Sequence, residues 1–330
     1  MYDWIRRLLF TLPPETAHTI ALMGLACAAK CLPPVPHGAK FAHEVMGISF
    51  PNRVGLAAGL DKNGDYIPAL MQIGFGFIEV GSVTPKPQSG NPKPRLFRLS
   101  KEQALINRMG FNNKGLDHLL KKVEALKVRP VLGINLGKGF ATPLISAVSD
   151  YLYGFDHAYP FADYVTINIS SPNTPDLRQM QTPELLRALL RQLKDKQAEL
   201  ADKTNRYVPL VIKIAPDLTV PELEVMADIF LEAKIDGVIA TNTTVQRFEL
   251  LSPHAHEAGG LSGAPLFLSS LEIVRLLYKR LENNIPIIAC GGIFSRQDGA
   301  AKLAAGAQLL QVYTGFIYKG PQLIRQLATL

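Results

Sequence analysis

The segment between residues 164 and 214 decides the fold class. It begins with Tyr164-Val-Thr-Ile-Asn-Ile169, continues through a helical pattern over Pro183–Leu200, and ends with Leu210-Val-Ile-Lys-Ile214. The two short β-rich runs are nearly continuous in apolar residues, as strands covered on both faces are. Parallel strands need a long crossover connection, which is usually a helix. The segment therefore predicts a strand–helix–strand unit of a parallel sheet.

The same alternation extends from residue 50 to the end of the chain. Six further β-rich runs begin at Val54, Phe77, Val131, Gly237, Ile285 and Leu309. Helical patterns lie between several of them, as at Val220–Ala233 and Ser269–Leu281. Eight such strands predict an α/β protein with one (β/α)8 TIM barrel, whose active site lies at the C-terminal strand ends. A length of 330 residues suits one barrel with an appendage.

The first forty residues are expected to form two short helices, separated by a Pro-Pro pair. Trp4, Leu8 and Leu12 share one face of the first helix, beside two arginines. Such a helical hairpin can cap the barrel, or its apolar face and cationic flanks can lie on a membrane. No apolar run here reaches the roughly 20 residues that span a bilayer. We therefore divide the chain into an N-terminal helical extension, residues 1–40, and a barrel, residues 41–330.

Composition limits the function classes without choosing among them. Lys and Arg number 35 against 28 Asp and Glu, a net charge of +7 that suits an anionic ligand, nucleic acid or an anionic lipid surface. The three cysteines include no CxxC pair for zinc or an iron–sulfur cluster. His254 and His256 lie in a loop without a third ligand at a suitable spacing, so we expect no metal site.

Polar residues gather where the predicted strands end. Asparagines come from four strand ends or loops, namely Asn107, Asn168, Asn173 and Asn242. Each alone is more often a turn or cap residue, but converging amides match a planar cyclic ligand that carries N–H and C=O groups. Lys213, inside an apolar strand, needs an anion, which is a neighbouring carboxylate or the edge of a reduced flavin. Glycines after the last two strands, such as Gly292, occupy the usual phosphate-binding position of a barrel.

Two segments outside the regular alternation border the predicted pocket. Residues 84–108 form an insertion in which Pro94–Leu99 and Ala104–Arg108 are expected to pair as a hairpin at the rim. The loop Ser170-Ser-Pro-Asn-Thr-Pro175 is rigid and rich in hydroxyl groups. It is either an ordered turn or, in a flavin site, the source of a base that removes a carbon-bound proton.

Long ordered motifs carry a resemblance to a known family. They are Gly55-Leu-Ala-Ala-Gly-Leu-Asp-Lys62, Asn107-Arg-Met-Gly-Phe-Asn-Asn113 and Asn168-Ile-Ser-Ser-Pro-Asn-Thr-Pro175, extended by Thr241–Thr244, Gly259–Gly263 and Tyr313–Phe316. On these motifs the chain resembles the dihydroorotate dehydrogenases over essentially its whole length. Ser171 stands where the cytosolic class 1 enzymes carry a catalytic cysteine, and class 1 lacks the N-terminal extension. The resemblance is therefore to the quinone-dependent, membrane-associated class 2.

This resemblance implies an activity and its partners. The expected reaction oxidises (S)-dihydroorotate to orotate in de novo pyrimidine (UMP) biosynthesis. One non-covalent FMN per chain would accept the hydride, and ubiquinone or menaquinone would be the final electron acceptor. The protein would be peripheral to the cytoplasmic face of the bacterial inner membrane. Neither nucleic acid nor an iron–sulfur partner subunit is expected.

The resemblance also implies roles for individual residues. Ser171 would take the C5 proton while C6 passes a hydride to the flavin, with a water-linked relay through Thr174. The FMN site would comprise Ala58, Gly59, Leu60, Asp61, Lys62, Ser82, Asn135, Asn168, Lys213, Thr241, Gly263, Gly292, Tyr313 and Thr314. The dihydroorotate site would comprise Lys62, Asn107, Arg108, Met109, Gly110, Phe111, Asn168, Asn173, Asn242 and Thr243. A quinone tunnel would be bordered by His18, Arg98 and Tyr313.

Two rival functions belong to different classes. Another FMN-dependent barrel, such as a dihydrouridine synthase acting on RNA, would be expected to carry a C-terminal RNA-binding appendage, whereas this sequence ends soon after the eighth strand, at Leu330. A basic scaffold that binds a membrane or nucleic acid would be colourless and would bind polyanions in a strongly salt-dependent way. A visible flavin spectrum separates both enzymes from the scaffold.

Overall fold

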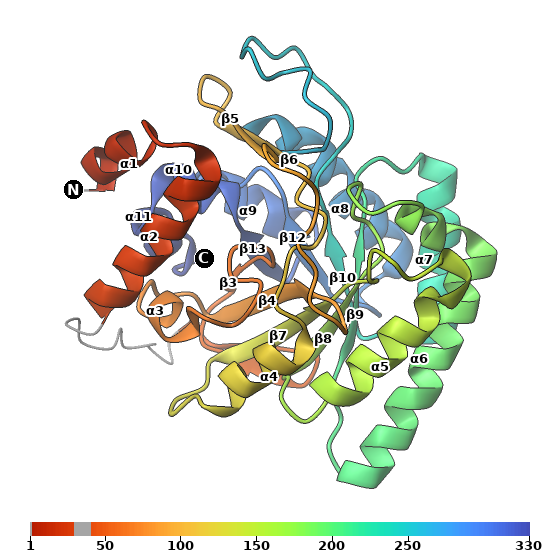
Figure 1. Ribbon diagram of the computed structural model, residues 1–330. Coiled ribbons are helices and arrows are strands. Elements are labelled where there is room, and N and C mark those ends of the chain that lie inside the picture. The colour runs from red at the N-terminus through yellow and green to blue at the C-terminus, as the bar shows by residue number, and fades with distance from the viewer. Residues whose placement is uncertain (1, 30–40) are drawn as a thin grey trace.

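Eight parallel strands close into a barrel in the computed structural model, which describes residues 2–29 and 41–330 (Figure 1). Around the barrel the strand order is β10-β12-β13-β3-β4-β7-β8-β9, and each neighbouring pair is parallel. The strands are β3 (Val54–Leu56), β4 (Phe77–Val83), β7 (Val131–Leu136), β8 (Tyr164–Asn168), β9 (Leu210–Ile214), β10 (Gly237–Ala240), β12 (Ile287–Cys290) and β13 (Leu309–Val312). The predicted (β/α)8 barrel is confirmed, and every predicted β-rich run overlaps one of its strands.

Helices cover the outside of the barrel. They are α3 (Ile67–Met71), α4 (Leu116–Glu124), α5 (Ala147–Ala158), α6 (Pro183–Thr204), α7 (Val220–Ala233), α8 (Phe267–Leu281), α9 (Arg296–Ala304), α10 (Thr314–Lys319) and α11 (Pro321–Leu327). The prediction for α7 has the observed bounds, because Thr219 and Glu222 form a reciprocal capping box at its start. Helix α6 extends beyond the predicted end at Leu200 and stops where Asn205 adopts a left-handed conformation. Short 3₁₀ turns occupy Leu144–Ser146, Leu177–Gln181 and Ala264–Leu266.

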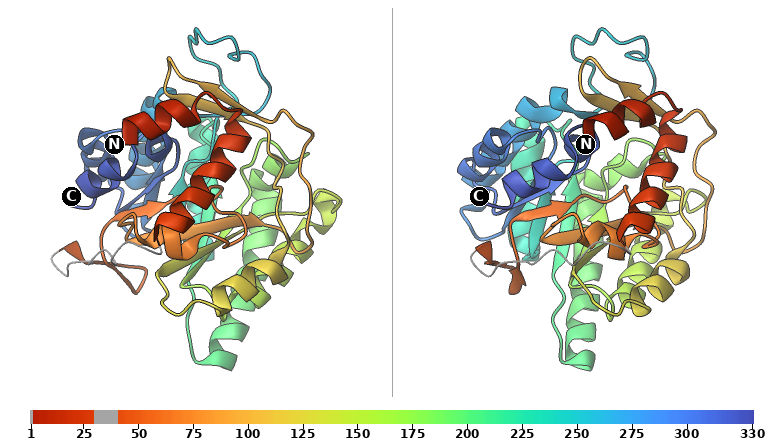
Figure 2. Two further views of the ribbon diagram at one scale, coloured as in Figure 1. Left: turned by 60° about the vertical axis from the view of Figure 1, so that its left-hand side comes forward. Right: turned by 90° about the vertical axis from the view of Figure 1, so that its left-hand side faces the viewer.

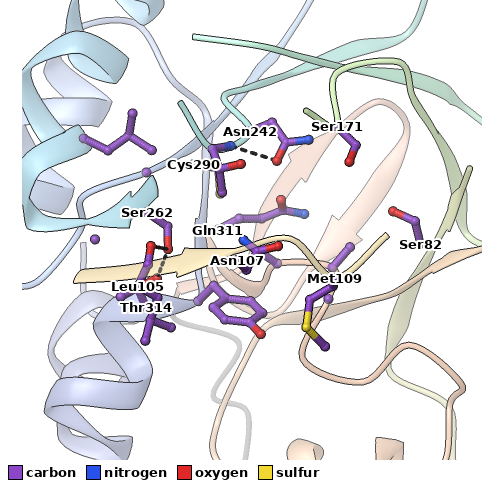
Figure 3. A pocket seen from close by; sticks show the side chains of 18 of the residues that line it. Ser82, Leu105, Asn107, Met109, Ser171, Asn242, Ser262, Cys290, Gln311 and Thr314 are labelled. Carbon is purple, nitrogen blue, oxygen red and sulfur yellow. Dashed lines mark hydrogen bonds between the residues drawn. The ribbon is translucent and has the colours of Figure 1, made fainter. Parts of the chain in front are cut away.

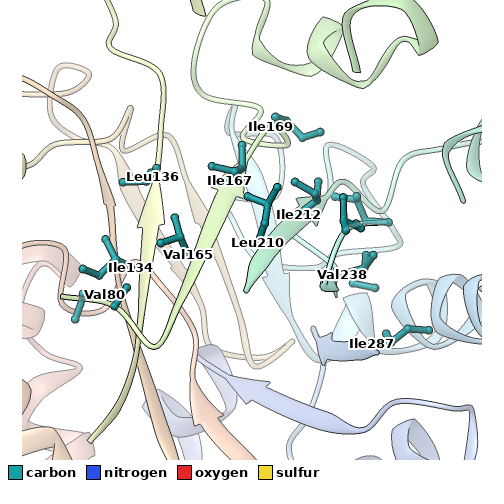
Figure 4. Close-up of a cluster of buried hydrophobic side chains, with 14 of the residues drawn as sticks. Val80, Ile134, Leu136, Val165, Ile167, Ile169, Leu210, Ile212, Val238 and Ile287 are labelled. Atoms are coloured by element: carbon teal, nitrogen blue, oxygen red, sulfur yellow. The ribbon is translucent and has the colours of Figure 1, made fainter. Parts of the chain in front are cut away.

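The period-2 alternation of each strand separates two cores. Outward-facing residues such as Val80, Ile134 and Ile212 pack against the helices in the main apolar cluster (Figure 4). A smaller apolar cluster fills the barrel interior at its base and includes Phe77 and Tyr164. Glycine is required opposite these rings, since a Cβ on Gly133 would lie 2.2 Å from the Tyr164 ring. The hairpin of β1 (His43–Val45) and β2 (Ile48–Phe50) contributes to this cluster.

A three-stranded antiparallel sheet stands outside the barrel. The predicted hairpin of the insertion is present as β5 (Leu96–Leu99) and β6 (Ala104–Asn107). Its third strand, β11 (Gly260–Gly263), pairs with β6 and was not predicted. β11 follows β10 in the chain, so the sheet connects the insertion with the segment that follows the barrel strand β10.

Two helices precede the barrel, as predicted. Helix α1 (Tyr2–Leu9) lies beside α10, and α2 (Pro14–Ala29) lies beside α3 and β5 (Figure 2). Side chains attach this pair to the rest of the molecule: the Tyr2 hydroxyl donates to the carbonyl of Ile317 at 2.6 Å, and Arg95 pairs with Glu15 at 2.7 Å. Residues 30–40 of the predicted extension lie outside the described residues. Among the helices of residues 2–29 and 41–330, none has the length and apolarity to cross a membrane.

Candidate active site

A layer of polar side chains lies inside the barrel above the apolar base. The alternation that points Phe77 and Val211 inward at the base also points Glu79 and Lys213 inward, each two residues further along the same strand. Asn168 and Lys213 are direct neighbours in the register of β8 and β9. All of these side chains are buried. Since the strands are parallel, the layer faces their C-terminal ends, where a barrel places its active site.

Glu79 organises this layer. Its carboxylate accepts hydrogen bonds from the Asn135 amide at 2.8 Å, the Tyr164 hydroxyl at 3.0 Å, the Thr166 hydroxyl at 3.1 Å and the Gln311 amide at 2.8 Å. The carboxylate is the acceptor in all four bonds, so the nitrogen end of each amide faces it. The amide nitrogens of Asn135 and Gln311 point at Glu79, and their oxygens point elsewhere.

This polarity continues from Asn135 to the asparagines of the pocket. The Ser82 hydroxyl donates to the Asn135 oxygen, and the Asn168 amide nitrogen donates to Ser82 at 2.9 Å. The Asn168 oxygen then accepts from the amide nitrogen of Asn242 at 3.2 Å and from the Ser170 hydroxyl at 3.1 Å. Each link uses one donor and one acceptor, so the buried carboxylate determines the orientation of the amides that face the cavity.

A single cavity collects most of these groups (Figure 3). Two of its lining residues carry polar atoms without a protein partner. The oxygen of the Gln311 amide is buried and makes no hydrogen bond with the described part of the chain. The Lys213 ammonium, 5% exposed, forms no hydrogen bond or ion pair with any residue the structure describes. The carboxylate that could have paired with it, Glu79, is occupied by four other donors. The Gln311 oxygen and the Lys213 ammonium are therefore available to bind a ligand in this cavity.

Two further titratable groups line the cavity, one from the loop after β3 and one from α2. Burial lowers the pKa of Lys62 to about 8, and the nearby positive charge of Arg95 acts in the same direction. Its ammonium donates to the carbonyl of Gly59 at 2.9 Å. Burial also lowers the pKa of His18 to about 4, helped by Lys62, so this imidazole is neutral at pH 7.

The loop after β8 brings a hydroxyl to the cavity. Ser171 is buried, lines the cavity, and its hydroxyl oxygen accepts the N–H of Asn173 at 3.3 Å. The Asn173 amide donates to the Asn107 oxygen at 3.2 Å, which ties the loop to β6. Behind the loop, Arg178 donates to the carbonyls of Ser170 at 3.3 Å and Thr243 at 3.1 Å. This loop is thus held at a defined place beside the asparagines.

The other end of the cavity is built from backbone. Gly263, Gly291 and Gly292 line it with φ of 109°, 115° and 74°, values that side chains rarely permit. Close approach matters as well, since a Cβ on Gly292 would lie 2.3 Å from the Phe267 Cα. Hydroxyls of Ser262 and Thr314 meet there at 2.8 Å. Such glycine-rich backbone with free N–H groups suits an anion.

Comparison with known proteins agrees with this geometry. A family model described as dihydroorotate dehydrogenase matches residues 40–329. The chain belongs to the dihydroorotate dehydrogenase family. A relative from Burkholderia cenocepacia, named dihydroorotate dehydrogenase (quinone), is 53% identical and is aligned over 99% of this chain and 96% of its own length. One of the same name from Azotobacter vinelandii is also 53% identical, over 99% of this chain and 95% of its own length.

Solved structures of the family have the same fold. The crystal structure of DHODH from Eimeria tenella in complex with ferulenol is similar with a TM-score of 0.89 and 40% sequence identity, covering 96% of this chain and 90% of that one. A ligand-free structure from the same organism gives a TM-score of 0.88 at 42% identity, covering 96% and 93%. At this identity the likeness extends beyond the fold to the family.

The cavity brings most of the predicted site residues of this dehydrogenase together. Those that line it are His18, Ala58, Gly59, Lys62, Ser82, Asn107, Met109, Gly110, Phe111, Asn168, Ser171, Asn173, Lys213, Thr241, Asn242, Thr243, Gly263, Gly292, Tyr313 and Thr314. They come from α2, from the ends of barrel strands and from the insertion. Most of the residues proposed for cofactor, substrate and base therefore line one cavity.

Six predicted residues do not line the cavity. Leu60 is in the main apolar core, and the Asp61 carboxylate accepts N–H groups of the following turn, including Tyr66 at 2.7 Å. Arg108 pairs with a loop glutamate at 2.6 Å, and Arg98 donates to the carbonyl of Phe10 at 2.9 Å. Thr174 is buried within its loop, and Asn135 lies one hydrogen bond behind Ser82.

Several cavity residues were missed by the sequence analysis. The sequence did contain a signal for Gln311, because it is a lone polar residue in an apolar strand, as Lys213 is. Glu79, which lies behind the cavity, is a lone polar residue of the same kind. Ser262 and Leu105 reach the cavity through the unpredicted pairing of β11 with β6. Glu15 reaches it from α2. No local sequence pattern predicts that Ser262, Leu105 and Glu15 line the cavity.

Proposed function

We propose that this protein oxidises dihydroorotate to orotate in pyrimidine biosynthesis, with FMN as hydride acceptor and a membrane quinone as final electron acceptor. One observation carries the proposal: the unpaired Lys213 ammonium and Gln311 oxygen share a cavity with four pocket asparagines and the Ser171 hydroxyl. These groups supply a cation, an acceptor and converging amides, which suit a flavin ring and a small cyclic imide stacked on it. The family membership supports the same reaction.

The residues present fit FMN. The Gln311 oxygen and the Lys213 ammonium would meet the polar edges of the ring, and Ala58, Gly59, Ser82, Asn168 and Thr241 would border it. Gly263, Gly292 and Thr314 would hold the phosphate with backbone and hydroxyl donors. Tyr313, whose pKa is raised to about 12 by burial, remains a neutral phenol beside them. Bound at these residues, FMN would supply the hydride acceptor for the substrate and the electron donor for the quinone.

Asparagines and one lysine orient the substrate. Asn107, Asn173 and Asn242 line the cavity with both donor and acceptor atoms, as a ring with alternating N–H and C=O groups requires. Lys62 supplies the positive charge for the substrate carboxylate. Met109, Gly110, Phe111 and Thr243 complete the wall around it. Holding the ring against the flavin face removes the entropic cost of their encounter from the chemical step.

Ser171 is proposed to remove the proton from C5 of dihydroorotate. Its hydroxyl is buried in a loop held by Arg178 and Asn173, so it lies at a defined place in the cavity. A serine hydroxyl is a poor base at its ordinary pKa and needs a path that carries its proton away. Thr174, buried in the same loop, is the proposed next member of this path.

Quinone is proposed to enter between α2 and the barrel. His18 of α2 and Tyr313 after β13 line the cavity on this side, and His18 is neutral there. Arg98 has a different place: its guanidinium lies over the Phe10 ring, 4.1 Å from the centroid, and binds the turn between the two helices. We propose that it shapes the entrance by holding that turn.

The two-part division of the chain and its location complete the proposal. Residues 1–40 would serve membrane association and quinone entry, and residues 41–330 would hold FMN and dihydroorotate. Helix α1 leaves Trp4 74% and Leu8 71% exposed, and Arg7 lies 5.3 Å from the Trp4 ring. An exposed apolar face with adjacent cations suits an anionic lipid surface. We propose a peripheral position on the cytoplasmic face of the bacterial inner membrane.

Changing Trp4 and Leu8 to glutamate should release the protein from lipid. Each buried apolar side chain contributes about 1.5 kcal/mol or more, so the double variant should bind anionic phospholipid vesicles at least about tenfold more weakly in a sedimentation assay. Leu268→Glu is the matched control, because Leu268 is an equally exposed leucine on the barrel. Equal binding by the double variant and the control would contradict the assignment of this face.

The pKa of Lys62 predicts a pH dependence for substrate capture. The protonated form binds the substrate carboxylate, and burial leaves that form intact only below a pH of about 8. kcat/KM for dihydroorotate, which follows the free enzyme, should be level below this pH and fall about tenfold per pH unit above it. Lys62→Met should give a low and level profile. A break that persists in the methionine variant would assign it to another group.

The proposed activity is tested by the colour of the purified protein. We expect a flavin absorbance spectrum that is bleached by dihydroorotate without oxygen and restored by a quinone. The flavin of a dihydrouridine synthase would not be bleached by dihydroorotate, and that enzyme would act on RNA. A colourless protein that takes up no added FMN would refute a flavoenzyme of either kind.

A further inference from the structure

A buried lysine lies behind the glycine end of the cavity, and its nearest acidic groups, Asp298 and the Cys290 thiol, do not contact it as ion-pair partners. Lys302 on α9 is 0% exposed, and its ammonium forms no ion pair with any residue in the described ranges. Its contacts are the Ser270 hydroxyl at 2.5 Å, the Phe267 carbonyl at 3.5 Å and the Phe267 ring, 5.3 Å from the centroid. Burial lowers the pKa of Lys302 to about 7. An unpaired buried ammonium is costly to folding, so its presence calls for a reason.

Hydrogen bonds connect this lysine to the loop that lines the cavity. An ammonium group only donates, so the Ser270 oxygen must accept from Lys302 and keep its own proton for another acceptor. That proton is within reach of the Gly291 carbonyl at 3.1 Å and the Phe267 carbonyl at the same distance. Lys302, Ser270 and Gly291 thus form a chain in which each hydrogen bond polarises the next.

The Gly291 carbonyl determines the direction of the next N–H group. In a trans peptide the C=O and the following N–H point in opposite directions. Because the Gly291 carbonyl is directed at Ser270 on α8, the N–H of Gly292 is directed away from α8. Gly292 lines the cavity, and its N–H has no hydrogen-bond acceptor among the described residues. The chain that begins at Lys302 therefore presents a free donor at the glycine end.

We propose that Lys302 is the counter-charge and positioning residue for the phosphate of FMN, acting through Ser270 on the Gly291–Gly292 peptide. This inference rests on the proposed function, because it assigns a partner to the phosphate end of that site. The direct contacts of the Lys302 ammonium are neutral oxygens, so the dianionic phosphate would supply the negative charge on the loop side, and the lysine would stabilise it from behind the loop. Lys302 reaches the loop only through Ser270 and does not line the cavity, so its effect should be confined to flavins that carry a phosphate.

Riboflavin, which has the same ring but no phosphate, makes the test specific. The full-length protein is stripped of flavin and titrated with FMN and with riboflavin, following flavin fluorescence. Lys302→Met should raise the Kd for FMN at least about tenfold and the Kd for riboflavin less than about twofold. Ser270→Ala keeps the charge and removes the link, and should raise only the FMN Kd, by a smaller factor. Lys279→Met, an exposed lysine on α8, controls for net charge and should change neither Kd.

Thermal unfolding gives a second measurement. Replacing an unpaired buried ammonium by a methionine of similar volume should leave the Tm of the flavin-free protein unchanged or raise it. The gain in Tm on adding FMN should shrink in the same variant. A large fall in the flavin-free Tm, with equal weakening of both flavins, would overturn the proposal in favour of a purely structural lysine.

The remaining outcomes are also decisive. An FMN Kd unchanged by Lys302→Met overturns the role of Lys302 while leaving the proposed function intact, since FMN still binds. Wild-type protein that takes up neither flavin refutes the proposed function, and the role of Lys302 with it. Selective loss of FMN affinity in both Lys302→Met and Ser270→Ala, with riboflavin unaffected, supports the whole chain from the lysine to Gly292.

Discussion

Replacing Ser171 by alanine is expected to slow flavin reduction by dihydroorotate by about 10² to 10⁴-fold, the usual contribution of a positioned general base. The change removes one oxygen and nearly preserves the volume, so FMN and orotate should still bind. Stopped-flow absorbance of the flavin measures this half-reaction alone. Native-rate reduction by the alanine variant would leave Ser171 as a turn residue and place the base elsewhere.

Two controls separate proton removal from damage to the loop. Ser171→Cys should retain more activity than the alanine variant, since a thiol can also accept a proton. Reoxidation of the reduced enzyme by quinone requires no C5 proton transfer and should keep its native rate in both variants. The Ser171 hydroxyl also accepts the N–H of Asn173. Slowing of both half-reactions together would therefore show that the loop has moved, contrary to our expectation.

Replacing Lys213 by methionine is expected to slow flavin reduction at least about 10²-fold, as loss of an electrostatic stabiliser of developing charge typically does. This buried ammonium has no hydrogen-bond or ion-pair partner among residues 2–29 and 41–330, and it lies beside the proposed ring position. The methionine variant should also bind FMN more weakly and show a lower reduction potential, because the reduced flavin loses its cation. Stopped-flow reduction and a dye-linked potential titration measure the two effects.

Lys138→Met is the matched control for Lys213. Lys138 is also a buried lysine, but its ammonium is satisfied by the carbonyls of Gly139 at 2.9 Å and Thr142 at 2.5 Å, and it does not line the cavity. Its replacement should lower stability without changing the potential. Equal potentials in the Lys213 variant and the wild type would show that the ring lies out of reach of Lys213.

The sequence alone was sufficient for the barrel and for the edge at which its site lies. Short apolar runs alternating with helical patterns are local signals, and a parallel barrel brings all C-terminal strand ends to one face. Asn168 and Lys213 could therefore be assigned to a common pocket before their register was known. The helical pattern over Val220–Ala233 is equally local, and its bounds are those of α7.

Other features depended on pairing between distant segments. Strand β11 joins β6 across more than 150 residues of sequence, and Gly260–Gly263 carries no alternating pattern that announces a strand. Arg98 matched a position at the tunnel by resemblance, yet its guanidinium binds the Phe10 carbonyl. A long side chain takes the partner that the packing of its neighbours leaves within reach, and this is not encoded locally.

The chemical polarity of the site was decided only by tertiary structure. The sequence shows that Asn135, Asn168 and Gln311 are amides. An amide donates through its nitrogen and accepts through its oxygen, and the sequence does not show which of the two atoms faces a given neighbour. The orientation of these amides follows from the Glu79 carboxylate, which accepts hydrogen bonds from the amide nitrogens of Asn135 and Gln311. Lys302 likewise acquires its proposed role only because α9 buries it beside Ser270. The sequence determines the type of each residue. The direction of a hydrogen bond and the free-energy cost of burying a charge depend on the atoms that folding places around them.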